Sequence, residues 1–131
     1  MAWQREFAQI PAAKLVFLDE SAAQTNMTRL RGRAPRGERV YDHAPAGHWR
    51  VTTMIGSIRL IEQTGASVRS LPVYSPDLNP IEKMWSKVKA LLRSAKARTP
   101  AALNRAIARA LAAVTAKDAQ GWFAACGYSI N

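Results

Sequence analysis

Two carboxylates in this sequence stand where they could hold a metal ion for chemistry on a phosphodiester. Asp19 follows the apolar run 14–18 (KLVFL), which predicts a buried strand, and Glu82 follows the stretch 75–81 (SPDLNPI), which predicts the start of a helix. Two divalent metal ions about 4 Å apart commonly assist phosphoryl transfer, and Mg²⁺ prefers carboxylate oxygens. Acids that converge from separate elements make such a site, so these two residues predict metal-dependent chemistry on nucleic acid.

Each carboxylate also has a structural interpretation. Glu82 lies three residues after Asn79, so the two residues fit a capping box at the N-terminus of a helix. Asp19 fits the turn that ends a strand, and Asp77 fits a turn within its proline-bracketed stretch. Spacing alone leaves both interpretations open for Asp19 and Glu82.

The charge balance favours a polyanionic partner. The 131 residues include 19 Lys and Arg against 9 Asp and Glu, a net charge of +10. Nucleic acid is the commonest partner of such a surface, and an anionic membrane surface is the alternative. No apolar run approaches the roughly 20 residues of a membrane span. The basic residues that we expect to contact DNA are Arg31, Arg33, Arg36, Lys83, Lys87, Lys89 and Arg93.

The single cysteine, Cys126, excludes an internal disulfide. Its simplest interpretation is a small buried apolar residue. One unpaired cysteine fits the reducing cytosol, and the N-terminal residues lack the pattern of a signal peptide, so we expect a cytoplasmic protein.

The elements that must position these residues form strands first and helices later. Expected strands lie at 14–18, near 26–31 and 38–41, at 50–60 and at 67–73, and expected helices at 59–66 (a helix end only), 79–98, 99–114 and 115–127. Asp19 then lies at the C-terminal end of its strand, and residues 43–49 form a loop. The order predicts an α/β domain with helices packed on a sheet. The strand at 50–60 runs directly into a helix end, which indicates that sequence is absent at this junction.

Several motifs together resemble the mariner-related bacterial insertion-sequence transposases of the DDE endonuclease superfamily. They read LVFLDES, TNMTRLRGRAPRGER, GHWRVTTMIG, LPVYSPDLNPIEKMWSKVK and the C-terminal GYS. YSPDLNPIE is the most specific of them. The resemblance covers nearly the full chain, so we expect residues 1–131 to form one catalytic domain.

The resemblance implies a ribonuclease-H-like mixed sheet with flanking helices and a role in cut-and-paste DNA transposition. In that family three acids bind two Mg²⁺ or Mn²⁺ ions, and Asp19 and Glu82 match the first and third acids. Asn79 and Pro80 would position the helix of Glu82. The implied partners are DNA and either a second copy or an intact transposase, with no membrane and no small-molecule substrate.

The sequence departs from the family pattern at the second acid. The family's DN dipeptide does not occur here, and counting back from Glu82 by the family's interval reaches Gly47. Asp77, Glu20 and Asp42 are the available replacements. One helix and one central strand of the family have no counterpart in this sequence, and their place would be near residues 58–60. The family's N-terminal helix-turn-helix has no counterpart either.

We therefore expect an internally deleted and N-terminally truncated catalytic domain whose catalysis is impaired. One alternative is a non-catalytic basic DNA-binding remnant that interferes with an intact transposase. Another is a decayed product without a selected function.

Overall fold

The structure, a computed structural model, describes residues 2–7, 9–59, 70–72, 74–128 and 130. Helices and strands are both present in this part of the chain, which confirms a mixed α/β composition. The elements are α1 (Ala2–Phe7), the short 3₁₀ helix η1 (Ala12–Lys14), β1 (Val16–Gln24), β2 (Val51–Arg59), the 3₁₀ turn η2 (Pro76–Leu78), α2 (Pro80–Ala95), α3 (Pro100–Ala112) and α4 (Ala116–Ala125).

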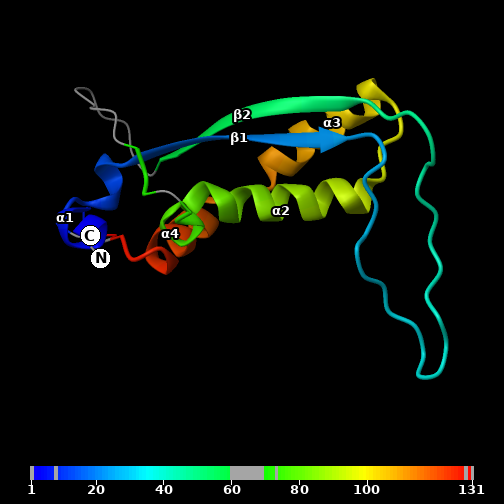
Figure 1. The fold of residues 1–131 in the computed structure, drawn as a ribbon, viewed down its shortest axis with the longest axis horizontal. Coiled ribbons are helices and arrows are strands. Elements are labelled where there is room, and N and C mark those ends of the chain that lie inside the picture. Colours follow the sequence, from blue (N-terminus) through cyan, green and yellow to red (C-terminus); the bar gives the residue numbers. More distant parts are fainter. Residues whose placement is uncertain (1, 8, 60–69, 73, 129, 131) are drawn as a thin grey trace. The chain divides into compact units, whose positions relative to one another are not determined.

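β1 and β2 pair as a two-stranded antiparallel sheet (Figure 1). The amide of Thr25, just after β1, donates to the carbonyl of Arg50, just before β2, at 3.0 Å. Both strands have nine residues, so continuing this pairing places Asp19 directly opposite Gly56. Burial alternates along both strands with period two, which agrees with this register.

β1 is longer than the sequence predicts. The expected strand ended at Leu18, with Asp19 at its C-terminal end; in the structure Asp19 is the fourth residue of β1 and lies inside the strand. That prediction was wrong because the polar run after Leu18 alternates between the two faces of the sheet and pairs with β2. The strand prediction at 50–60 is confirmed by β2, with residue 60 outside the described part of the chain.

Residues 26–50, which we name the arm, connect the two strands as a long loop (Figure 1). The predicted short strands near 26–31 and 38–41 do not form, whereas the loop at 43–49 does. Every residue from 29 to 50 is exposed, so no apolar face is available to stabilise a strand pair there. A turn at the tip is closed by a 3.0 Å hydrogen bond from the Glu38 amide to the Pro35 carbonyl, with Gly37 at φ 92°.

α2 confirms the predicted helix. Its buried side chains are Pro80, Ile81, Met84, Trp85, Val88 and Leu92, whereas Leu91 is 38% exposed. The helix ends at Ala95, before the expected residue 98, because Lys96 adopts a left-handed backbone with φ 48°.

The last two helices begin as the sequence predicts. The Thr99 hydroxyl accepts the Ala102 amide at the start of α3, and Thr115 with Asp118 forms a capping box at the start of α4. In α3, Leu103 is buried, whereas the apolar Leu111 is 42% exposed. Two alanines, Ala106 and Ala110, instead lie buried; small side chains allow a helix to approach its neighbours closely.

The chain divides into two compact units. The carboxylate unit comprises Met1–Glu20, Ile55–Trp85 and Val114–Asn131, and the arm unit comprises Ser21–Met54 and Ser86–Ala113. Three aromatic rings meet in the core of the carboxylate unit: the centroid of Phe17 lies 5.5 Å from Phe123 and 5.1 Å from Tyr128. The prediction of a single domain stays a prediction.

Two expected elements fall mainly on residues that the structure does not describe. Of the helix end at 59–66, only Arg59 is described, and it closes β2. Of the strand at 67–73, residues 70–72 are described and form no strand. The proposed junction near 58–60 therefore stays a prediction.

Candidate functional site

Asp19 projects from the face of β1 that packs into the core. It shares this face with the buried Phe17 and Ala23 and is itself partly exposed. Its Oδ1 accepts the amide of Glu20 at 2.9 Å. Glu20 lies on the opposite, exposed face of β1, so it is wrongly placed to share a ligand with Asp19.

Gly56 connects the strand of Asp19 to the helix of Glu82. A Cβ atom at Gly56 would lie 2.8 Å from both Cζ2 and Cη2 of Trp85. The Trp85 indole therefore packs directly on the β2 residue that pairs with Asp19, at a place that only glycine allows. Since Trp85 follows Glu82 by about one helical turn, this contact brings the start of α2 to the region of the sheet that carries Asp19.

Glu82 lies exposed in the first turn of α2. Pro80 is the first residue of that helix, as predicted, and the Glu82 amide donates to the backbone carbonyl of Asn79 at 3.2 Å. The predicted side-chain cap was wrong: Asn79 is only 9% exposed, and its Oδ1 has no hydrogen-bond partner. Asn79 also ends η2, and its side chain is buried there instead of accepting an amide of α2.

Tyr128 holds the turn that precedes Glu82. Its hydroxyl donates to the Leu78 carbonyl at 2.5 Å and accepts the Trp3 indole N–H at 3.4 Å. Burial raises the pKa of Tyr128 above its ordinary value. The same ring packs against Phe17 of β1, so one residue contacts both the strand of Asp19 and the turn before α2. The sequence suggested no such role for the GYS motif, because the hydrogen bond spans 50 residues.

The described residues do not supply the donors of a complete two-metal centre. No group of three His, Cys, Asp or Glu side chains in this part of the chain is placed to hold a metal ion. Asp77 lies exposed in η2, and Asp42 is held by Lys96. Asp19 and Glu82 stand without a third acid there, so we derive no reaction step through a metal.

The basic residues of α2 differ in their surroundings. Lys87 is partly buried, and its ammonium donates to the Ala113 carbonyl after α3 at 2.9 Å, a favourable position for a cation. Lys83 lies near the buried thiol of Cys126; burial raises the pKa of this thiol, and the charge of Lys83 opposes the rise. Lys89 and Arg93 are partly exposed. Their predicted contact with DNA stays a prediction.

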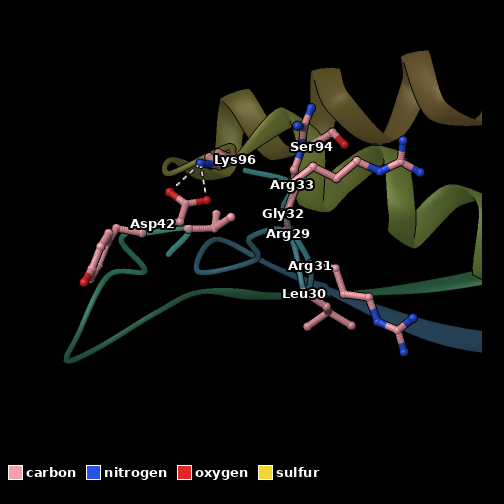
Figure 2. A pocket seen from close by; sticks show the side chains of 10 residues that line it. Arg29, Leu30, Arg31, Gly32, Arg33, Asp42, Ser94 and Lys96 are labelled. Carbon is pink, nitrogen blue, oxygen red and sulfur yellow. Dashed lines mark hydrogen bonds and ion pairs between the residues drawn. The ribbon is translucent and has the colours of Figure 1, made fainter. Parts of the chain in front are cut away.

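The arm unit contains a basic pocket of about 600 Å³ (Figure 2). Its lining residues come from both limbs of the arm and from the end of α2: Arg29, Leu30, Arg31, Gly32, Arg33, Val40, Tyr41, Asp42, Ser94 and Lys96. Four of these side chains are cationic and one is acidic. Arg36 lies exposed at the tip of the arm, outside the pocket.

Asp42 and Lys96 form an ion pair in the wall of this pocket (Figure 2). The Lys96 ammonium lies 2.7 and 2.5 Å from the two carboxylate oxygens. Asp42 also accepts the Thr28 hydroxyl at 3.2 Å and the His43 amide at 2.8 Å. These donors, Lys96 first, lower the pKa of Asp42 to about 2.

The comparison with protein families supplies one match. Residues 57–104 match the family of DDE superfamily endonucleases. The matched segment covers 48 of the 131 residues and contains Asn79, Pro80, Glu82 and the basic residues of α2. No curated protein and no solved structure matches.

This family acts on DNA, so the match agrees with the charge of +10. Among the described helices, none is long and apolar enough to cross a membrane.

Proposed function

We propose that this chain is a transposase-type DNA endonuclease and strand-transfer domain whose catalysis is impaired. The observation that carries the proposal is the family match at 57–104, which includes Glu82 in the first turn of α2. Asp19 and Glu82 are the proposed catalytic and metal-binding residues, with Mg²⁺ or Mn²⁺ as the cofactor. The contact of Trp85 with Gly56 supports a common site for the two acids.

The proposed impairment follows from the number of acids. In a two-metal mechanism, cleavage of a phosphodiester depends on two ions held in fixed geometry, and two carboxylates hold them more weakly than three. The exposure of apolar side chains on the outer face of the sheet supports an internal deletion near residues 58–60. Leu18 is 70% exposed and Ile55 is 81% exposed on this face. Helices usually cover both faces of the sheet in α/β domains. In this proposal residues 1–131 are one partial catalytic domain of ribonuclease-H-like type, located in the cytoplasm.

A nicking assay on supercoiled DNA with Mg²⁺ and with Mn²⁺ tests the impairment. We expect no metal-dependent cleavage above background. Robust cleavage that disappears in both Asp19→Asn and Glu82→Gln would contradict the impairment and establish these residues as catalytic.

Electron paramagnetic resonance measures Mn²⁺ binding and so tests whether the two acids bind metal, independently of cleavage. We expect weak binding that is lost in Asp19→Asn and in Glu82→Gln. Glu20→Gln is the matched control, because Glu20 is adjacent in sequence but lies on the other face of β1. An equal loss in the control, or no binding by the unmodified protein, would refute the proposed metal site.

The second candidate function is DNA binding without cleavage. The basic pocket of the arm unit favours it, because four cations line the pocket and phosphate is their natural partner. Such a protein could interfere with an intact transposase, by occupying its DNA or by pairing with it. Salt-dependent binding of a DNA duplex is expected for both functions, and metal-dependent cleavage distinguishes them.

A further inference from the structure

The cations that line the basic pocket are unequally available to a ligand. Among the described residues, the guanidinium groups of Arg29, Arg31 and Arg33 make no hydrogen bond or ion pair. Lys96 is the exception, because both oxygens of Asp42 contact its ammonium. Figure 2 shows the arginine guanidinium groups lying away from this pair. One cation of the pocket is therefore already neutralised from within.

Lys96 is well placed to contact a phosphate. It follows the last residue of α2, where its left-handed backbone (φ 48°) directs the chain away from the helix axis. Its side chain is 38% exposed, as is that of Asp42, so solvent and ligands reach the pair. Ion pairs this exposed contribute little to stability, and an ammonium has no geometric preference for carboxylate over phosphate.

We propose that the pocket binds the phosphates of DNA and that Asp42 acts there as an internal competitor, occupying Lys96 until a phosphate displaces it. This inference rests on the proposed DNA binding and adds a specific residue that weakens it. The carboxylate also repels an incoming phosphate. Removing its charge should therefore strengthen binding, although Asp42 itself lies in the binding pocket.

Asp42→Asn is the decisive variant. The amide keeps the size of the side chain. Its Oδ1 can still accept the His43 amide, and its Nδ2 can donate to the Thr28 hydroxyl oxygen, so both contacts that hold this part of the arm can remain. Glu38→Gln is the matched control. Glu38 lies on the same arm, is exposed and does not line the pocket, so both variants change the net charge equally.

The experiment measures the affinity of a short random-sequence DNA duplex at several salt concentrations. Each added phosphate contact steepens the logarithmic salt dependence by about 0.9 for duplex DNA. We expect Asp42→Asn to bind several-fold more tightly at low salt with a slope steeper by about that amount. Glu38→Gln should leave the slope unchanged, and the double variant Asp42→Asn, Lys96→Met should lose the gain.

Three results would overturn the inference: equal effects of Asp42→Asn and Glu38→Gln, weaker binding by Asp42→Asn, or a gain that persists in the double variant. Weaker binding would mean that Asp42 serves to hold the arm in its binding conformation. If Asp42→Asn strengthened binding of inorganic phosphate but not of the duplex, DNA would be excluded as the ligand. If the unmodified protein showed no salt-dependent binding of the duplex, the proposed DNA binding itself would fail, whatever the variants did.

Discussion

The carboxylate unit and the arm unit hold their candidate functional residues by different means. In the first, buried contacts hold the elements of Asp19 and Glu82: Trp85 on Gly56, and the Tyr128 hydroxyl on the Leu78 carbonyl. In the second, every residue from 29 to 50 is exposed, and an ion pair holds the arm at the end of α2. Metal chemistry requires side chains fixed within a fraction of an ångström, whereas binding a phosphate backbone requires mainly charge. The difference between the units matches the difference between these two tasks.

The largest expected effect is a difference in stability loss between two tryptophan variants, one in each unit. Trp85 is 3% exposed and Trp49, in the arm, is 49% exposed. Trp85→Ala should lower the free energy of unfolding by about 3–5 kcal/mol, and Trp49→Ala should lower it by less than about 0.5 kcal/mol. Urea denaturation measures both, and similar losses in the two variants would remove the contrast between the units.

Gly56 gives the next largest effect. Gly56→Ala places a methyl group against the Trp85 ring and should destabilise the protein by about 2–3 kcal/mol, because the ring or the strand must shift. Gly121→Ala is the control, since Gly121 lies in α4 with open space around it. That variant should be stabilising by up to about 1 kcal/mol. Urea denaturation should show opposite signs, and a harmless Gly56→Ala would show that α2 does not depend on this contact.

Tyr128→Phe should destabilise the protein by about 1–2 kcal/mol, because the buried Leu78 carbonyl loses its donor. Tyr74→Phe serves as the control, since Tyr74 is 97% exposed. Hydrogen exchange then tests positioning directly. The Glu82 amide, which donates to Asn79, should exchange faster in Tyr128→Phe relative to the amides of α3. A uniform acceleration across all helices would indicate a general loss of stability instead.

The smallest effect is the pH dependence of the arm. The pKa of Asp42 is about 2, below its ordinary value of 3.8, with the Lys96 hydrogen bond as the first cause. Because the folded value is the lower one, the stabilising ion pair is fully present above pH 3.8 and is lost as the pH falls through about 2. A carboxyl carbon NMR titration should show the low midpoint, and Lys96→Met should move it back towards 3.8. An unchanged midpoint in that variant would show that Lys96 does not hold Asp42.

Local signals in the sequence predicted the helices well. Pro80, Thr99 and the pair Thr115 with Asp118 each start a helix through contacts within a few residues, and such contacts follow from spacing alone. β2 followed in the same way from its β-branched composition.

The failures concern partners that are distant in sequence. The length of β1 depends on pairing with β2, so its extension beyond Leu18 was not predictable from composition. The arm forms no strands at 26–31 and 38–41, although the sequence predicts them, because its residues from 29 to 50 are all exposed and pack against no apolar surface. Asn79 fitted a cap by type and spacing, yet its oxygen is buried without a partner. Asp19 and Glu82 were identifiable as candidates from their motifs, whereas the contacts of Gly56 and Tyr128 that position them were not.

The packing of Trp85 on Gly56 also makes Trp85 an intrinsic fluorescence probe of this contact. The Trp85 indole is 3% exposed and its Nε1 has no hydrogen-bond partner, so it should emit at shorter wavelength than an indole in water. The half-exposed ring of Trp49 should emit at longer wavelength than Trp85. A shift of the α2 N-terminal region away from the sheet would let water reach the Trp85 ring and move that emission to the red. Trp85 emission from the unlabelled chain would thus report a change in the surroundings of the Asp19 strand.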